Sequence, residues 1–260
     1  MTWPRPNREL LERAYASREY YAARGMDDGA VAQARARAVD LACGVGRPVR
    51  RVLDYGAGEG HLVRAFRSLG LVADGVEPSV AGRDQARLRY GLELGSALPP
   101  AGVELYDLMI LQHVLEHVTD PVAVLRDLSR RLDPLGSMLI EVPNASSFEM
   151  LRPSRRRVIL DLPVHLYHFT PRTLRAVLGA AALEAVDVTL TNPDWLEWLF
   201  ALRANRGSKD AEHEASGVRG ARSRFAPDWS PFRGAWRERV LPALRRWTPG
   251  WKFSVLARRA

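Results

Sequence analysis

Residues 52–60 read VLDYGAGEG, and this stretch decides the fold. An apolar run ends at Asp54 and is followed by a glycine at every second position, before a helix-like segment at residues 61–69. The three glycines are Gly56, Gly58 and Gly60. Glycine allows the backbone to turn tightly and to approach a ligand where any Cβ would collide. The pattern therefore predicts a strand, a turn that cradles a ligand, and a helix.

The residues around this turn narrow the choice of ligand. The fingerprint for a dinucleotide pyrophosphate, GxGxxG, requires a glycine at position 61, where this chain has His61. Asp54 stands two residues before the first glycine. A carboxylate there would repel a pyrophosphate but attract a cationic amino-acid group. The turn is thus better suited to a ligand that carries an ammonium group.

A second acid follows at the place expected for a ribose contact. An apolar segment at residues 71–76 is interpreted as the next strand, and it ends at Glu77, 19 residues after Gly58. A carboxylate at this strand end can accept hydrogen bonds from both hydroxyls of a ribose diol. Together, Asp54, the glycines and Glu77 resemble the first motifs of the class I S-adenosylmethionine (SAM) dependent methyltransferases.

Two later segments extend this resemblance. YDLMILQHVLEHVTDP at residues 106–121 and HLYHFTPRTLRAVL at residues 165–178 resemble the subgroup of ubiquinone-pathway O-methyltransferases and of sugar and natural-product methyltransferases. The resemblance covers roughly residues 15–191 and the last strand. It implies a class I SAM-dependent methyltransferase with an α/β, Rossmann-like fold. The implied sheet is seven-stranded and mostly parallel, with helices on both faces and an antiparallel last strand.

The composition divides the chain into four parts. Residues 1–46 are expected to form an N-terminal helical cover, and 47–192 the SAM-binding core. Residues 193–250 are expected to form a helical insertion rich in Trp and Arg that acts as an acceptor lid, and 251–260 the last strand of the core sheet. Within the core, further strands are expected at residues 91–94, 105–111, 135–144 and 185–190, and helices at residues 81–89, 121–131 and 171–178.

The resemblance also implies which residues contact the cofactor. They are Asp54, Tyr55, Gly56, Gly58, Gly60, Glu77, Pro78, Ser96, Ala97, Gln112 and, from the N-terminal cover, Tyr21. Related enzymes often place an acid where this chain has Ser96, so a hydroxyl or backbone groups would bind the adenine here. For Tyr20 and Tyr21, closing over the cofactor and packing a helix on the core both remain open.

A group of histidines is expected at the acceptor. Methyl transfer from a sulfonium is an in-line displacement, and a hydroxyl acceptor also needs a base or a metal to remove its proton. His113, Glu116 and His117 stand at i, i+3 and i+4, so on a helical turn they share one face. His165 and His168 arrive from a later loop. The candidate catalytic residues are therefore His113, His117, His165 and His168.

Two interpretations of this group remain open. Related metal-assisted enzymes carry ExxEH at this place, whereas this chain has His113 where they have the first Glu. In the first interpretation, a divalent ion is held by His113, Glu116, His117 and His165, with a preference shifted from Mg²⁺ towards Zn²⁺ or Fe²⁺. In the second interpretation, Glu116 and His117 have a structural role and hold the loop in place, and His113 or His168 is the general base.

Length and composition indicate a globular chain. It has 260 residues, 47% of them hydrophobic, which suits one α/β domain with an elaboration. Cys43 is the single cysteine, so no intramolecular disulfide can form. No stretch approaches the roughly 18 apolar residues of a spanning helix. A cytoplasmic location is therefore expected.

The net charge of +8 is concentrated near the C-terminus. Residues 201–260 hold 14 Lys and Arg against 5 Asp and Glu, and six of the seven tryptophans lie at residues 195–251. The leading hypothesis is methylation of a small-molecule acceptor, at a hydroxyl oxygen. An RNA 2′-O-methyltransferase that uses this basic segment is an alternative, and a non-catalytic SAM-fold binding subunit is another. Peripheral contact with an anionic membrane remains open too.

Overall fold

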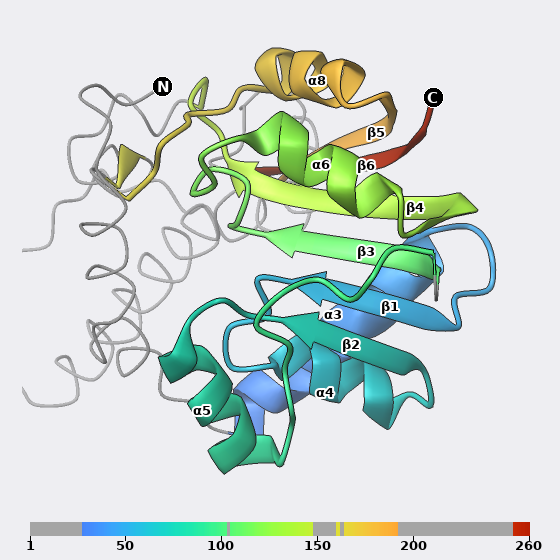
Figure 1. The fold of residues 1–260 in the computed structure, drawn as a ribbon, viewed down its shortest axis with the longest axis vertical. Coiled ribbons are helices and arrows are strands. Elements are labelled where there is room, and N and C mark those ends of the chain that lie inside the picture. The colour runs from blue at the N-terminus through green and yellow to red at the C-terminus, as the bar shows by residue number, and fades with distance from the viewer. Residues whose placement is uncertain (1–27, 103–104, 148–159, 162–163, 192–251) are drawn as a thin grey trace, which may run out of the picture.

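The computed structural model describes residues 28–102, 105–147, 160–161, 164–191 and 252–260. These residues contain a six-stranded sheet with the strand order β2-β1-β3-β4-β6-β5 (Figure 1). The strands are β1 (Arg51–Tyr55), β2 (Val72–Val76), β3 (Tyr106–Gln112), β4 (Leu132–Pro143), β5 (Leu183–Thr191) and β6 (Lys252–Arg259). The first four are parallel to one another, and β6 runs antiparallel between β4 and β5. The expected antiparallel last strand is thus confirmed.

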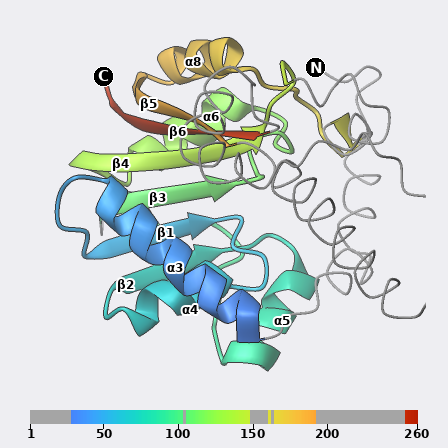
Figure 2. The same cartoon turned by 180° about the vertical axis from the view of Figure 1, so that it is seen from behind.

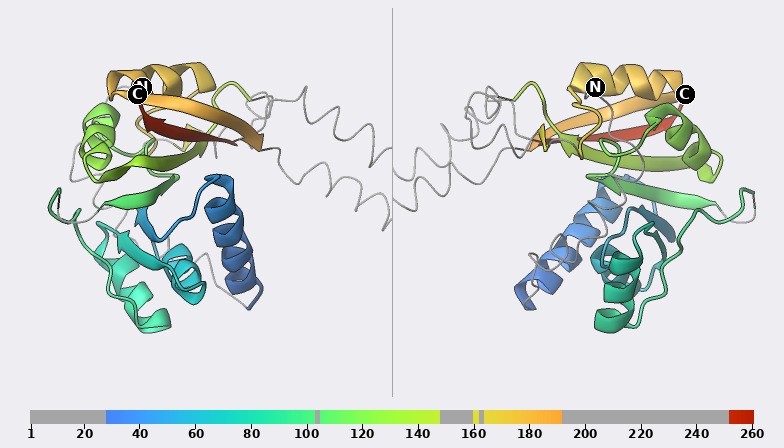
Figure 3. Two further views of the ribbon diagram at one scale, coloured as in Figure 1. Left: turned by 90° about the vertical axis from the view of Figure 1, so that its right-hand side faces the viewer. Right: turned by 60° about the vertical axis from the view of Figure 1, so that its left-hand side comes forward.

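Helices cover both faces of this sheet, as expected. They are α3 (Asp28–Gly44), α4 (His61–Ser68), α5 (Val80–Tyr90), α6 (Pro121–Ser129) and α8 (Pro171–Ala180). Figures 2 and 3 show α3 and α4 on one face and α6 on the other. Each face has its own core: residues of α3, α4 and α5 pack under β1 and β3, whereas residues of α6 and α8 pack on β3, β4 and β6.

Both α6 and α8 begin with a side-chain cap. The Asp120 carboxylate accepts a hydrogen bond from the Ala123 N–H at the start of α6, and the Thr170 hydroxyl accepts one from the Thr173 N–H at the start of α8. Each cap is followed by a proline in the first turn, where a missing N–H costs nothing. These caps fix the residues at which α6 and α8 begin.

The strand predicted at residues 91–94 is the clearest difference. This stretch is not a strand, and the only ladder contact near it is the isolated parallel bridge between Val76 and Gly95. Gly91 has a left-handed φ of 63° and caps α5 instead of opening a strand. The side chain of Leu94 is buried against Gly75, where a Cβ would lie 2.7 Å from Leu94 Cδ2. The sheet therefore has six strands in the described residues, where seven were predicted.

Several predictions fall outside the described residues. They concern the first part of the helical cover, with Tyr20 and Tyr21, and the insertion at residues 193–250. The division into cover, core and lid accordingly stays a prediction. Among the helices that the structure does describe, none combines the length and the apolar character needed to cross a bilayer.

Candidate cofactor and acceptor site

The strand order predicts a ligand-binding crevice at the carboxyl ends of β1 and β3. These two strands are neighbours, and the chain continues from β1 to β2 on one side and from β3 to β4 on the other. Their carboxyl ends point the same way (Figure 1). In open α/β sheets, ligands bind at such a switch point, outside the carboxyl ends of the strands. Both groups of candidate residues, the glycine loop after β1 and the histidines after β3, follow these ends.

The glycine loop needs glycine for two different reasons. Gly56, Gly58 and Gly60 all have left-handed φ values, of 83°, 55° and 78°. A Cβ on Gly56 would lie 2.3 Å from Val114 Cγ2, and one on Gly60 would lie 2.9 Å from Leu92 Cδ1. A Cβ on Gly58 would meet no atom of the described residues within 4 Å. Gly58 therefore faces a space that these residues leave open, where a ligand can reach the backbone.

Glu77 is buried directly beside this open space. Its Oε2 accepts the Gly58 N–H at 2.8 Å, and its Oε1 accepts the Ser79 N–H at 2.8 Å. Burial raises the pKa of Glu77, although these two hydrogen bonds favour the charged form. Each carboxylate oxygen can accept two hydrogen bonds, so each keeps one lone pair for a further donor. The side chain is thus held in place with capacity for two hydroxyl groups.

Asp54 lies at the end of β1 and is 5% exposed. Burial raises its pKa to about 7, and the neighbouring charge of Glu77 adds to the effect. A buried carboxylate is costly to ionise unless a cation joins it. A cationic ligand group beside Asp54 would therefore favour the ionised form.

The remaining cofactor candidates surround the same crevice. The Glu77 N–H donates to the Gly95 carbonyl at 2.9 Å, which brings the Ser96 loop beside the end of β2. Pro78, Ser96 and Ala97 are exposed, whereas Tyr55 and Gln112 are half-buried. Tyr21 lies outside the described residues.

The histidines of the first segment lie on a tight turn after β3. His113 has a left-handed φ of 52°, which is uncommon for a residue with a side chain, and its N–H donates to the Glu141 carbonyl at 2.9 Å. The His117 N–H then donates to the Val114 carbonyl at 3.0 Å. The segment is a turn and not a helix, but it directs Glu116 and His117 to one place.

Two backbone hydrogen bonds bring the second histidine segment to the first. The carbonyl of Glu116 accepts the N–H groups of Leu166 at 2.8 Å and Tyr167 at 3.1 Å. The rings of His117 and His165 consequently meet edge to face, with their centroids 4.7 Å apart. The prediction that the two segments converge is confirmed by these contacts.

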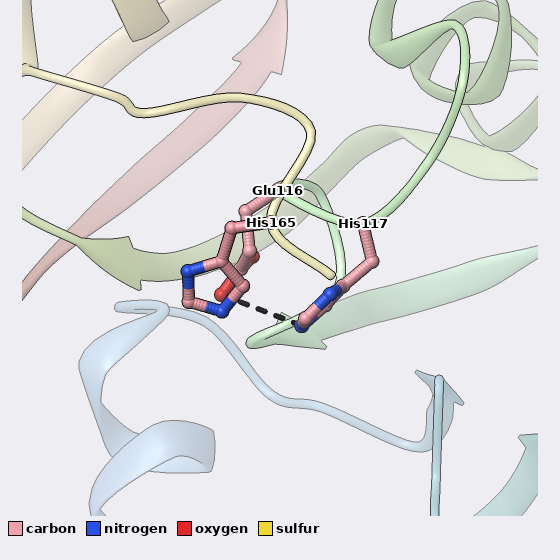
Figure 4. Close-up of side chains that lie close together, drawn as sticks. All are labelled: Glu116, His117 and His165. Carbon is pink, nitrogen blue, oxygen red and sulfur yellow. Dashed lines mark ion pairs between the residues drawn. The ribbon is translucent and has the colours of Figure 1, made fainter. Parts of the chain in front are cut away.

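Glu116, His117 and His165 form a compact group, called the acceptor triad below (Figure 4). Each offers one ligand-type atom, and these atoms lie within 4.8 Å of one another. Glu116 is 1% exposed, and within the described residues neither of its carboxylate oxygens has a hydrogen-bond partner. A buried carboxylate without hydrogen bonds is expected to have a cation close by.

The protonation of His117 follows from its surroundings. Its Nδ1 lies 3.3 Å from the Val164 carbonyl oxygen, which can only accept, so Nδ1 carries the proton. Burial lowers the pKa of His117, and the neighbouring His165 adds to this effect while Glu116 opposes it. The neutral ring therefore presents the lone pair of Nε2, which lies 4.0 Å from Glu116 Oε1.

His113 and His168 lie at the edge of the triad. His113 Nδ1 is 3.3 Å from Glu116 Oε1, and its Nε2 is 3.6 Å from Glu141 Oε1. His168 Nε2 lies 3.0 Å from the Leu160 carbonyl oxygen, and burial lowers its pKa. Three of the four predicted metal ligands thus converge, while His113 contacts the carboxylate from outside.

Glu141, which is 2% exposed in β4 and lies next to His113, is not among the site residues predicted from the sequence. The strand predicted at residues 135–144 contains it without a role. An acid in the run LGSMLIEVPN was the available signal, because a buried carboxylate must have cationic or hydrogen-bonding partners.

Comparison with known proteins agrees with this geometry. The methyltransferase domain family matches residues 20–188. The ubiquinone biosynthesis O-methyltransferase of Dinoroseobacter shibae is 34% identical over 170 residues, which are 59% of this chain and 68% of the relative. The corresponding enzyme of Azorhizobium caulinodans is 29% identical over 174 residues, which are 60% and 68% of the two chains.

A solved structure gives the same picture of the fold. The 1,6-didemethyltoxoflavin-N1-methyltransferase of Burkholderia thailandensis, with its substrate and S-adenosylhomocysteine bound, has a TM-score of 0.55 and 18% identity. The match covers 100% of this chain and 93% of that one. The chain therefore belongs to the methyltransferase domain family. It is a class I SAM-dependent methyltransferase.

Proposed function

We propose that this methyltransferase transfers the methyl group of SAM to a hydroxyl oxygen of a small molecule. The observation that carries the proposal is the acceptor triad, in which the neutral His117 ring turns an Nε2 lone pair towards Glu116. The turn that holds the triad packs on the glycine loop through Val114 and Gly56. A proton acceptor and the cofactor loop thus lie side by side. The ubiquinone biosynthesis O-methyltransferases, relatives in sequence, also support oxygen as the acceptor.

The cofactor residues have distinct roles in this proposal. Asp54 binds the ammonium group of SAM, and the backbone at Gly58 accommodates its methionine part. Glu77 accepts hydrogen bonds from the two ribose hydroxyls with the lone pairs that the Gly58 and Ser79 N–H groups leave. Tyr55, Gly56, Gly60, Pro78, Ser96, Ala97 and Gln112 line the rest of the cofactor site, and Tyr21 covers it.

The transfer itself needs few groups. The acceptor oxygen attacks the methyl carbon in line with the carbon–sulfur bond, which breaks and leaves neutral S-adenosylhomocysteine. The acceptor hydroxyl gives its proton to a base, and His117 Nε2 is the group with the required lone pair. Glu116 stabilises the imidazolium that results, because its oxygens are buried and lack hydrogen bonds among the described residues.

A divalent metal is the other way to activate the acceptor. Glu116, His117 and His165 would hold it, and their two imidazoles and one carboxylate suit Zn²⁺ or Fe²⁺ better than Mg²⁺. The orphaned oxygens of Glu116 fit such an ion. When bound, the metal would lower the pKa of the acceptor hydroxyl. His113 lies outside the three and would support Glu116 instead of binding the ion.

Chelation separates the metal from the general base. If the triad holds a metal, activity should disappear in excess chelator and return when Zn²⁺ or Fe²⁺ is added. Full activity in excess chelator would leave His117 as the base. In that case His165 and His168 only line the site beside His117. The centroids of the His165 and His168 rings lie 6.5 Å apart.

The experiment that tests the function uses SAM with a labelled methyl group. The enzyme is incubated with a metabolite extract and, separately, with total RNA. Label in an O-methylated small molecule is expected. Label in RNA alone would favour the alternative of an RNA 2′-O-methyltransferase, which the basic composition of residues 201–260 supports. Cofactor binding without transfer to either would support a non-catalytic subunit.

A further inference from the structure

Glu141 joins three parts of the fold behind the acceptor triad. Its Oε1 lies 2.8 Å from Lys252 Nζ of β6, and its Oε2 lies 3.1 Å from Arg37 Nη2 of α3. The Ser254 hydroxyl donates to the same Oε2 at 3.1 Å. The side chain is 2% exposed. A carboxylate buried this deeply is stable only because these partners surround it.

The charge of Glu141 is also set by these partners. Burial alone would raise its pKa, but the pKa is lowered overall because Lys252, His113 and Arg37 lie against the carboxylate. Glu141 is therefore an anion at neutral pH. Its position is set by contacts from two separate elements, Arg37 of α3 and Lys252 and Ser254 of β6.

His113 is held by Glu141 through both its main chain and its ring. The His113 N–H donates to the Glu141 carbonyl at 2.9 Å, and the ring Nε2 lies 3.6 Å from Glu141 Oε1. These contacts accompany the left-handed φ of 52°, which is unfavourable for a histidine and needs support from its surroundings. The other ring nitrogen, Nδ1, then lies 3.3 Å from Glu116 Oε1.

We propose that Glu141 is a positioning residue that acts through His113: it holds the His113 ring against Glu116 and so orients the Glu116 carboxylate within the acceptor triad. This inference rests on the proposed function. Among the described residues Glu116 has no hydrogen bond to its carboxylate, and His113 Nδ1, at 3.3 Å from Oε1, lies closer to it than His117 Nε2, at 4.0 Å. Removal of such an outer partner typically lowers activity about 10- to 100-fold.

The chain offers suitable variants for a test. Glu141→Gln keeps the size of the side chain and removes its charge. Glu141→Asp keeps the negative charge among Lys252 and Arg37 but shortens the side chain, which moves the carboxylate further from His113, already 3.6 Å away. Because it keeps the charge, it guards against a variant that simply fails to fold. Ser254→Ala is the matched control, because it removes another partner of Glu141 without touching His113.

The first readout is a double-mutant cycle on kcat with the labelled-methyl assay. We expect Glu141→Gln and Glu141→Asp to lower kcat at least about tenfold, with the affinity for S-adenosylhomocysteine unchanged. Ser254→Ala should change kcat less than about twofold. In a His113→Ala background, Glu141→Gln should lower kcat little further, because the two residues act as one unit. An undiminished effect of Glu141→Gln in that background overturns the inference.

The second readout does not depend on turnover. The chain has six histidines, and the ring ¹⁵N resonances of His113 are identified by their loss in His113→Ala. They should shift in both Glu141 variants and stay in place in Ser254→Ala. Unmoved His113 resonances in the Glu141 variants overturn the inference, whatever the acceptor is. If the wild-type enzyme methylates no hydroxyl, the proposed function fails, while this readout still decides the role of Glu141.

Discussion

At the scale of single residues, Asp54 shows how function can oppose stability. Its pKa is raised to about 7 in the folded protein, chiefly by burial, and is close to 3.9 in an unfolded chain. A group with a raised folded pKa stabilises the fold while it is protonated. That contribution is complete below about pH 4 and is lost as the pH rises through about 7. In the cofactor-free protein Asp54 is therefore about half protonated near pH 7, and above that pH its buried charge destabilises the fold.

The first prediction concerns Asp54→Asn. The amide has no charge to bury, so at pH 8 the cofactor-free variant should be more stable than the wild type, by up to about 4 kcal/mol from a shift of about three pKa units. Its affinity for S-adenosylhomocysteine should fall, because the ammonium group loses its counter-ion. Thermal melts and calorimetry measure both quantities. A variant that is destabilised at pH 8, or that binds as tightly as the wild type, contradicts this role.

The second prediction is the pH dependence of cofactor binding. An ammonium beside Asp54 favours the carboxylate, so binding releases a proton wherever Asp54 is protonated in the free protein. Affinity for S-adenosylhomocysteine should therefore rise up to about tenfold per pH unit from pH 5.5 towards 7, and level off above that. Calorimetry across this range measures the slope. Asp54→Asn is the control, and a slope that persists in it assigns the proton to another group.

At the scale of elements, the glycine loop depends on the turn at residues 113–117, called the acceptor turn here, and that turn depends on the loop. A Cβ on Gly56 would overlap Val114, the residue after His113, whereas a Cβ on Gly58 would meet no atom of the described residues within 4 Å. Both residues have a left-handed φ. The loop therefore positions the cofactor on one side and supports the acceptor turn on the other.

The third prediction compares Gly56→Ala with Gly58→Ala. Each alanine must adopt an unfavourable φ, at a cost of about 1 to 3 kcal/mol. Gly56→Ala has the additional clash with Val114, so its melting temperature should fall further. Gly58→Ala should stay closer to the wild type in stability but lose affinity for S-adenosylhomocysteine, because its Cβ enters the open space. Equal losses of stability with unchanged cofactor affinity would contradict the assignment of that space.

The sequence was sufficient for some elements and not for others. The glycine turn and the caps at Asp120 and Thr170 could be predicted because they are local: a few adjacent residues determine them. The strand expected at residues 91–94 was wrong because Gly91 ends α5 and Leu94 packs into the core beneath the loop, which an apolar pattern alone does not distinguish from a strand.

The candidate site, too, could be predicted from the sequence only in part. The spacing of Glu116 and His117 indicated one face, and the later histidines pointed to the same crevice. The partners of Glu141 lie more than 100 residues away along the chain, at Arg37, Lys252 and Ser254. Only the folded sheet brings them together, so no local pattern could predict that group.

At the scale of the whole molecule, the last strand joins β5 to the rest of the sheet and reaches the site. β6 pairs with both β4 and β5, and Lys252 and Ser254 at its start contact Glu141. Next to them, Phe253 is fully buried in the core that also holds α6 and α8. The end of the chain thus contributes to the same structure as the first strands.

The fourth prediction follows from this packing. Phe253→Ala should lower the free energy of unfolding by about 3 to 5 kcal/mol, because it leaves a cavity in the core. Leu135→Ala is the matched control: this side chain is 72% exposed, so its loss should change stability by no more than about 0.5 kcal/mol. Denaturant unfolding measures both. Similar small effects for the two variants would mean that β6 is not integral to the core.

The central claim is that His117 and its neighbours activate a small-molecule hydroxyl beside a bound SAM. The most direct measurement is transfer of labelled methyl from SAM to a hydroxyl acceptor by the wild type and by His117→Ala, with S-adenosylhomocysteine affinity measured in parallel. We expect an O-methylated product and a loss of roughly 100-fold or more in His117→Ala, with cofactor affinity unchanged. Undiminished transfer by His117→Ala would contradict this role of His117.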